Sequence, residues 1–328
     1  MPAKVVKKGV FVSVAGSQRT TVESFRVKSA RNERYQGFKR TMLPCSKAQS
    51  LKHAFTVDLE DWFHGIPIPR ESKTVAERRL HVGTERLLEF LDRFQTRATF
   101  FVLAGICHQY PELVRRIAAA NHDLGSHGHS HDLIYEMSRC RFLDETRFAM
   151  RALEDCIGRP VTSYRAAYFS ITRQSLWALE VLAGEGIRYD SSIFPIKNWR
   201  YGIPDYSRRP VRIETANGPV LEFPLSTRRL LGRNIPTTGG AYFRIYPYWL
   251  TRLNMLASER EGMPVVFYLH PWELDTEHPR LRFHPLAMAT HYFNLRSTAP
   301  KLQRLLTDFS FTTLREALED AIPQSSQP

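Results

Sequence analysis

Three carboxylates lie close together near residue 60. Asp58, Glu60 and Asp61 fall within four residues, at the end of the strand-like run Phe55–Leu59. Ionising three neighbouring acids is costly unless a cation or an arginine compensates their charge. The cluster therefore indicates a metal site, with a solvent-exposed acidic strand end as the alternative.

Three histidines form a second cluster. His127, His129 and His131 alternate along the segment Gly125–Asp132. If the chain turns into a helix there, the i to i+4 spacing lets His127 and His131 face one point, while His129 points elsewhere and could support a ligand or contact substrate. Imidazole and carboxylate ligands favour Zn²⁺, with Co²⁺, Ni²⁺ or Fe²⁺ as alternatives, over Ca²⁺ or Mg²⁺. A chance polar loop is the competing interpretation.

Three further polar residues lie near the ends of predicted strands. They are Arg165, Asp190 and His270. Taken singly, a surface ion pair or a buried histidine would explain them. In a parallel α/β fold, however, the carboxyl ends of several strands converge on one site. The sequence therefore predicts that these residues meet the two clusters at one edge of the sheet.

Short apolar or β-branched runs alternate with amphipathic segments from residue 54 onward, as in parallel strands joined by crossover helices. Strands are predicted at Phe55–Leu59, Thr99–Leu103, Asp123–Ser126, Ser163–Ala166, Val220–Pro224 and Val265–Leu269. Helices are predicted at Thr84–Phe94, from Pro111, and at Leu143–Ile157, Arg173–Ala183, Tyr248–Arg260 and Leu302–Phe309, followed by a short strand and helix over Phe311–Leu318. This order fits a barrel or an open doubly wound sheet.

Two other features of the chain constrain this organisation. The segment Trp199–Gly218, rich in Arg, Pro and Tyr, is predicted to be a long surface loop that shapes a substrate groove. No G-x-G-x-x-G or G-x-x-x-x-G-K-[ST] motif follows a predicted strand, so neither a dinucleotide nor a nucleoside triphosphate site is indicated.

The basic charge is concentrated at the amino-terminal end. The 328-residue chain has a formal net charge of +13, and residues 1–50 hold eleven Lys or Arg against two Glu. We predict a basic, disordered tail over residues 1–50, a catalytic domain over 51–320 and a flexible tail over 321–328. Because the body is only mildly basic, nucleic acid is not expected as a partner.

Composition also bears on location. No apolar run approaches the roughly 18 to 20 residues that a membrane-spanning helix needs. Lys4–Lys8 and the apolar run Gly9–Gly16 resemble a weak signal peptide, but the basic residues that follow oppose export. The four cysteines show no C-x-x-C pair and no disulfide spacing. We therefore expect a cytoplasmic protein, with secretion or the periplasm as the alternative, and the oligomeric state stays open.

These motifs, in this order, resemble the NodB-homology polysaccharide deacetylases of carbohydrate esterase family 4. The resemblance covers roughly residues 54–319. The motifs D-x-E-D-W-F, S-H-G-H-S-H and Y-L-H-P-W-E-L-D resemble most the subgroup linked to exosortase and exopolysaccharide loci. The fold that the resemblance implies is a distorted (β/α)₇ barrel. The implied activity is metal-dependent hydrolysis of the acetamide on N-acetylated sugars.

The resemblance also implies roles for the two clusters. Asp58 matches the general base, and His127 and His131 match two metal ligands. The third ligand is a carboxylate from the same strand end. Strand alternation places Glu60 on the face of Asp58 and favours Glu60, whereas a turn after the strand would favour Asp61.

Three more roles follow from the resemblance. Arg165 matches the arginine that orients the base, and His270 matches the general acid that protonates the leaving nitrogen. Asp190 matches the acid that supports this histidine. A backbone N–H near Tyr168 is expected to stabilise the oxyanion. Ala167 replaces the usual proline two residues after the arginine, which leaves the local loop shape open.

Two aromatic residues adjoin the proposed catalytic residues. Trp62 and Trp272 are predicted, with Tyr168, to contact a sugar, because sugar rings present flat C–H faces that pack on aromatic side chains. The expected partner is an N-acetylated glycan. The competing interpretations are an allantoinase-like or deformylase-type hydrolase of a small C–N substrate, and a non-catalytic protein that binds carbohydrate or nucleic acid.

Overall fold

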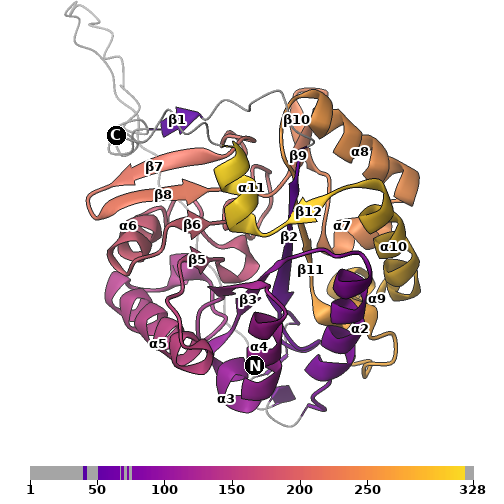
Figure 1. Ribbon diagram of the computed structural model, residues 1–328, viewed down its shortest axis with the longest axis horizontal. Helices are drawn as coiled ribbons and strands as arrows, with labels where there is room; N and C mark the ends of the chain where they lie inside the picture. The colour runs from indigo at the N-terminus through magenta and orange to yellow at the C-terminus, as the bar shows by residue number, and fades with distance from the viewer. Residues whose placement is uncertain (1–39, 43–50, 67, 70–71, 74–75, 322–328) are drawn as a thin grey trace, which may run out of the picture. The chain divides into compact units, whose positions relative to one another are not determined.

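Seven parallel strands form the centre of the protein. The computed structural model describes residues 40–42, 51–66, 68–69, 72–73 and 76–321. In chain order the parallel strands are β2 (His53–Leu59), β3 (Thr99–Val102), β4 (Asp123–Ser126), β5 (Ser163–Tyr164), β6 (Tyr189–Asp190), β8 (Gly218–Glu222) and β11 (Val266–Leu269). Each strand up to β8 pairs with the next, and β11 returns to pair with the other edge of β2 (Figure 1).

The sheet curls into a barrel that backbone pairing does not close. Within the described residues, no strand pairing joins β8 to β11. Side-chain hydrogen bonds bridge this gap instead: Val266 N donates to Ser226 Oγ at 2.8 Å, and Thr238 Oγ1 donates to the Val266 carbonyl at 2.9 Å. The predicted distorted (β/α)₇ barrel is therefore confirmed.

Further strands extend or flank this sheet. The antiparallel strands β1 (Arg40–Met42) and β7 (Val211–Thr215) continue it beyond β8, and β12 (Phe311–Thr312) pairs with β2. A separate hairpin consists of β9 (Thr227–Leu230) and β10 (Arg233–Pro236). The predicted loop Trp199–Gly218 is wrong in part, because strand β7 lies inside it and pairs with β8. Strand β1 lies inside the predicted tail 1–50, and the rest of that tail falls outside the described residues. Of the tail predicted over 321–328, Ala321 ends α11 and the remaining residues fall outside the described ones.

The alternation of β2 explains how the barrel presents its acids. Phe55, Val57 and Leu59 pack outward against helices in the main apolar core. The alternate side chains point to the opposite face of the strand, toward the barrel interior. Asp58 and Glu60 are therefore both directed inward by the same pleat that buries the three apolar residues.

Helices cover the outside of the barrel (Figure 1). They are α2 (Leu80–Arg93), α3 (Ala104–Gln109), α4 (Pro111–Ala119), α5 (Arg139–Ile157), α6 (Trp177–Gly184), α7 (Gly240–Ile245), α8 (Tyr248–Arg260), α9 (Pro285–Tyr292), α10 (Thr298–Asp308) and α11 (Leu314–Ala321). Helix α5 begins where the Ser138 side chain accepts a hydrogen bond from Arg141 N and ends at Gly158, whose φ of 68° suits glycine. No helix among the described residues is long and apolar enough to cross a membrane.

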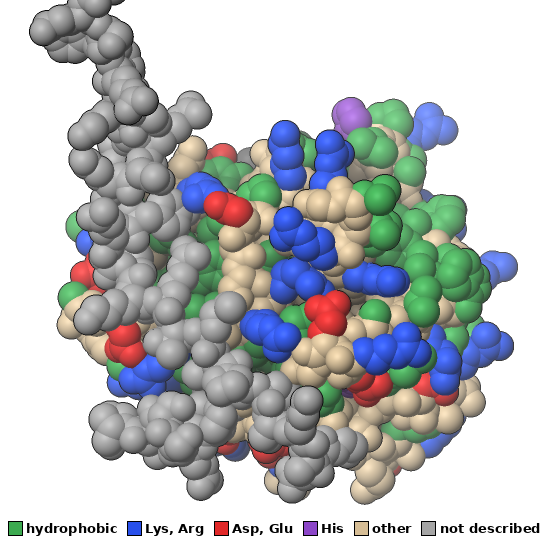
Figure 2. All heavy atoms as spheres, turned by 90° about the horizontal axis from the view of Figure 1, so that it is seen from above, with side chains coloured by type: hydrophobic (Ala, Val, Ile, Leu, Met, Phe, Trp, Pro, Cys, Tyr) green, Lys and Arg blue, Asp and Glu red, His purple; other side chains and the backbone are tan. Residues whose placement is uncertain are grey.

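The described body also has a basic face. Figure 2 shows Lys and Arg side chains gathered on the face seen from above, with fewer acidic side chains among them. The larger share of the net charge nevertheless lies in residues 1–50. Of the four cysteines, Cys107, Cys140 and Cys156 are free thiols in the described part of the chain.

Candidate active site and metal centre

The carboxyl ends of four parallel strands supply the candidate site. Asp58 and Glu60 come from the end of β2, and His127 follows β4 directly. Arg165 follows β5, and His270 follows β11. Parallel strands end on the same side of a sheet, so residues far apart in the sequence converge there.

Glu60, His127 and His131 form a compact group of potential metal ligands. Their ligand atoms lie within 4.8 Å of one another. Oε1 of Glu60 lies 2.8 Å from His127 Nε2 and 2.7 Å from His131 Nε2. Burial would raise the pKa of Glu60, but the two imidazoles outweigh it and hold the pKa well below the usual value. Two imidazole nitrogens and an ionised oxygen around one point suit a divalent cation such as Zn²⁺.

The orientation of His127 is set by its other ring nitrogen. Nδ1 lies 2.8 Å from the backbone carbonyl of Arg165. A proton on Nδ1 would be donated to that carbonyl, which leaves the Nε2 lone pair directed at the ligand position. Arg165 therefore orients His127 through its backbone carbonyl, while its side chain pairs with Asp58.

Asp61 has a different role from Glu60. Its carboxylate accepts hydrogen bonds from Trp62 N at 2.9 Å, Arg79 N at 3.0 Å and Leu80 N at 3.2 Å, at the start of α2. Asp61 is not part of the group of potential ligands. Of the two carboxylates that the sequence left open, the geometry favours Glu60, because Asp61 is engaged by backbone donors and by the positive end of a helix dipole.

Asp58 and Arg165 form a buried ion pair. Arg165 Nη1 donates to Asp58 Oδ1 at 2.8 Å and to Thr56 Oγ1 at 2.8 Å. Its remaining donors bind Ser191, with Nε to the carbonyl and Nη2 to Oγ, each at 2.9 Å. The guanidinium also lies 4.4 Å above the ring of Phe101. Arg165 is thereby fixed, and it holds one oxygen of Asp58 while the other faces His270, whose Nε2 is 3.8 Å away.

His270 is held by a second buried ion pair. Glu273 Oε1 lies 2.9 Å from His270 Nδ1 and accepts a hydrogen bond from His270 N at 3.0 Å. Its other oxygen accepts a hydrogen bond from Arg244 Nε at 2.6 Å. Burial lowers the pKa of His270, but the hydrogen bond to Glu273 and the negative charges of Glu60, Glu273 and Asp58 outweigh burial and raise the pKa to about 9. His270 is therefore protonated at neutral pH.

The predicted role of Asp190 is wrong. Asp190 pairs with Glu222 on the neighbouring strand β8 and accepts a hydrogen bond from Ser192 Oγ at 2.7 Å. Burial and the neighbouring Asp190 carboxyl raise the pKa of Glu222 well above its usual value. The support for His270 comes from Glu273 instead. The separation of three residues between His270 and Glu273 in the sequence could have revealed this support. No sequence signal indicated Arg244.

The structure buries the two tryptophans that the sequence predicts to contact a sugar. Trp62 is 1% exposed, donates a hydrogen bond from Nε1 to the Glu77 carbonyl and belongs to a buried apolar cluster that also contains Trp272. Trp272 stacks against His270 at 5.4 Å and supports the imidazole from within the protein. Tyr168 remains beside the site, with its ring 4.5 Å from that of His131.

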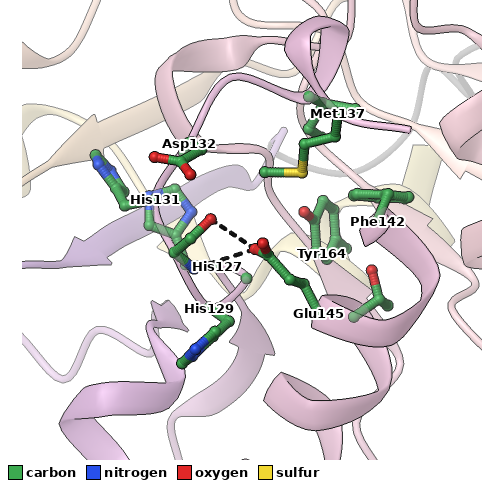
Figure 3. A pocket seen from close by; sticks show the side chains of 13 residues that line it. His127, His129, His131, Asp132, Met137, Phe142, Glu145 and Tyr164 are labelled. Carbon is green, nitrogen blue, oxygen red and sulfur yellow. Dashed lines mark hydrogen bonds between the residues drawn. The ribbon is translucent and has the colours of Figure 1, made fainter. Parts of the chain in front are cut away.

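The histidine loop is attached to α5. Ser130 donates to Glu145 Oε2 through both its backbone N, at 3.3 Å, and its Oγ, at 2.6 Å, across a small pocket (Figure 3). His129 points away from the other two histidines in this view and packs edge-on against Phe148 at 4.5 Å. The structure therefore separates His129 from the candidate ligands.

Two segments of the chain match known families. Residues 78–185 match the family described as polysaccharide deacetylase. Residues 191–319 match a domain of unknown function, DUF3473. The site spans both matched segments, because His127 and His131 lie in the first and His270 and Glu273 in the second, while Asp58 and Glu60 precede the first.

Curated relatives match only part of the chain. A peptidoglycan deacetylase of Helicobacter pylori is 27% identical over 112 residues, which is 34% of this chain and 37% of the relative. A chitooligosaccharide deacetylase of Bradyrhizobium sp. is 30% identical over 104 residues, 31% of this chain and 46% of the relative. The chain thus spans less than half the length of each of these relatives.

Solved structures with a similar fold cover most of the chain. A Mycobacterium smegmatis protein assigned to the polysaccharide deacetylases has a TM-score of 0.58 at 19% identity, over 88% of this chain and 97% of that one. One from Pseudomonas aeruginosa has a TM-score of 0.55 at 15% identity, over 81% and 89%. At these identities the likeness establishes the fold. The family match itself covers residues 78–185, and the exosortase-linked subgroup stays a prediction.

Proposed function

We propose that this chain is a metal-dependent N-deacetylase of N-acetylhexosamine residues in a polysaccharide or its precursor. The observation that carries the proposal is the arrangement of two groups at one edge of the barrel. A Glu60, His127 and His131 group adjoins an acid–base pair in which Asp58 Oδ2 and His270 Nε2 lie 3.8 Å apart. Hydrolysis of an amide needs a base for water and an acid for the nitrogen, and this pair offers both.

The base and the acid are distinguished by their surroundings. Arg165 holds one oxygen of Asp58 by a hydrogen bond and so orients the carboxylate, whose second oxygen can take a proton from the attacking water. His270, with a pKa raised to about 9, can donate a proton to the departing nitrogen. The C–N bond then breaks to give acetate and a free amino sugar. The backbone at Tyr168 is the proposed donor to the oxyanion.

Glu60, His127 and His131 would hold the metal ion, which we propose to be Zn²⁺. A bound divalent cation would polarise the acetamide carbonyl and lower the pKa of water. The three residues come from two strand ends whose positions the barrel fixes, and the Arg165 carbonyl orients His127. Ligand spacing is therefore preorganised before any cation binds.

The nature of the substrate is supported by the relatives. Both relatives described above carry names of deacetylases that act on glycans, one on peptidoglycan and one on chitooligosaccharide. We propose an N-acetylated glycan for this chain as well, and membership of the exosortase-linked subgroup. The support for the subgroup is the three motifs around Asp58, His127 and His270.

Acetate release from N-acetylglucosamine oligomers tests the proposal. The purified protein is stripped with a chelator and then resupplied with Zn²⁺ or Co²⁺. We expect the metal to restore acetate release in the wild type and in His129→Ala, but not in His127→Ala. The matched pair of histidine variants lies on one loop, so a difference between them reports metal binding rather than loop folding.

The outcomes separate the competing functions. Stoichiometric metal without acetate release from any glycan would favour hydrolysis of a small C–N substrate. Protein that binds no metal would contradict the proposed site. Strong DNA binding that survives deletion of residues 1–41, together with no hydrolysis, would favour a nucleic-acid-binding protein that uses the basic face of the body.

A further inference from the structure

The segment 195–204 lies near the candidate site and carries an unusual set of side chains. It contains Lys197 and Arg200 and no acidic residue. Trp199 is 91% exposed, although large aromatic side chains are normally well covered. An exposed indole next to two cations suits contact with a polar ligand that also has flat apolar faces.

The backbone of this segment is fixed by hydrogen bonds. Gly202 has a φ of 99°, and a Cβ there would lie 2.3 Å from the Ile196 carbonyl, so only glycine fits. The Tyr135 hydroxyl donates to the Arg200 carbonyl at 2.9 Å. Arg200 N donates to Asn198 Oδ1 at 2.9 Å. The segment therefore presents Trp199 and Arg200 from a preorganised loop.

The guanidinium of Arg200 lies beside the proposed metal ligands. Its Cζ is 3.6 Å from the centre of the Tyr168 ring, and that ring is 4.5 Å from the ring of His131. Lys73 adds a second cation to the same wall, because its Nζ and the Tyr168 hydroxyl both donate to the His64 carbonyl, at 2.9 and 3.2 Å. Two cationic side chains thus lie on the rim next to the ligands.

Arg200 differs from the two buried arginines of the site. Arg165 and Arg244 each pair with a carboxylate, Asp58 and Glu273 respectively. Within the part of the chain that the structure describes, no carboxylate lies within ion-pair distance of Arg200. A guanidinium stacked on a ring retains N–H donors for a planar anion.

We propose that Arg200 binds an anionic group of the substrate, a carboxylate or a phosphate, while Trp199 packs on a neighbouring sugar ring. The inference rests on the proposed deacetylase function and narrows its substrate class to acidic glycans or phosphorylated precursors. Arg200 thereby selects the substrate and takes no part in bond cleavage.

Matched probes test this selection. Chitotetraose is the neutral probe, a hyaluronan tetrasaccharide provides carboxylates, and N-acetylglucosamine 1-phosphate, compared with N-acetylglucosamine, provides a phosphate. Dissociation constants and kcat/KM for acetate release are measured for the metal-loaded wild type and for Arg200→Gln, Arg200→Lys and Arg93→Gln. Arg93 is a suitable control because it is an exposed arginine over a ring, 5.8 Å from Phe90, on α2.

We expect the wild type to bind one anionic probe more tightly than its neutral counterpart. Arg200→Gln should weaken binding of that probe roughly 10-fold to 100-fold, and Arg200→Lys should weaken it less. The probe that shows it identifies the carboxylate or the phosphate as the group bound. Equal binding of both probe types by the wild type, or equal effects of Arg200→Gln and Arg93→Gln, would overturn the inference. Arg200-dependent binding without acetate release would instead contradict the proposed function alone.

Discussion

The candidate site contains two buried arginine–carboxylate pairs, which differ in whether the carboxylate has an oxygen free of hydrogen bonds. In the Asp58–Arg165 pair, one aspartate oxygen accepts from the arginine and the other faces His270 at 3.8 Å, beyond hydrogen-bonding distance. In the Glu273–Arg244 pair, both glutamate oxygens are occupied, by Arg244 on one side and His270 on the other. The first carboxylate is available for proton transfer, and the second is a support.

The two pairs also come from different regions of the chain. Asp58 and Arg165 lie in the amino-terminal part of the barrel, and Glu273 and Arg244 lie in the segment that matches DUF3473. Arg244 is tied further to that segment, because it donates to the carbonyls of His291 at 2.9 Å and Phe293 at 2.8 Å. The carboxyl-terminal segment therefore supplies His270 and the ion pair that holds it.

Replacing Asp58 by Asn should have the largest effect. Asparagine can still accept from Arg165 but cannot take a proton, so we expect kcat to fall by about 10²- to 10⁴-fold with metal content unchanged. Acetate release and metal analysis on the same sample measure this. Turnover within a few-fold of the wild type would show that Asp58 is a support like Glu273, and the contrast between the pairs would disappear.

Replacing Arg244 by Met should mainly reduce stability. Glu273 would keep a buried charge with His270 as its one remaining partner, and loss of the guanidinium should cost about 3–5 kcal/mol in the free energy of unfolding. Urea denaturation measures this. The double variant Arg244→Met/Glu273→Gln should lose less than the sum of the two single variants, because the buried charge is removed. Strictly additive losses would mean that the pair is not a coupled unit.

Replacing Glu273 by Gln should change the pH dependence of turnover. His270 must be protonated to act as an acid, so activity falls as the pH rises through its pKa of about 9. Without the glutamate charge this pKa decreases, so the fall should move to lower pH and kcat at neutral pH should decrease about 10- to 100-fold. Glu277→Gln, at an exposed position, is the control. An unmoved alkaline limb would remove Glu273 from the mechanism.

Replacing Asp61 by Ala should have the smallest effect. The change removes the acceptor for N–H groups at the start of α2 and should cost about 1–2 kcal/mol of stability. Metal content should stay unchanged, whereas Glu60→Gln should lose the metal. Thermal unfolding and metal analysis of the two variants report this. Metal loss in Asp61→Ala with retention in Glu60→Gln would reverse the assignment of the carboxylate ligand.

The residues predicted correctly share one property: their position follows from local periodicity. The strand Asp123–Ser126 and the helix Tyr248–Arg260 were predicted with the bounds that the structure shows. Period-two alternation along β2 favoured Glu60 over Asp61. The features that the sequence did not indicate depend on neighbours across the barrel. Asp190 faces Glu222 through strand pairing, and Trp62 is covered by a cluster that includes residues more than 200 positions away.

The sequence by itself determined which chemistry is available and at which strand ends it lies. Local sequence patterns show the clustered acids and histidines and the alternation of strands and helices, so these features can be recognised without knowledge of the fold. Only the tertiary structure decided which partner each side chain has, namely Glu273 rather than Asp190 for His270. The physical reason is that hydrogen bonds and ion pairs form over about 3 Å between side chains whose separation in the sequence carries no information about distance in space.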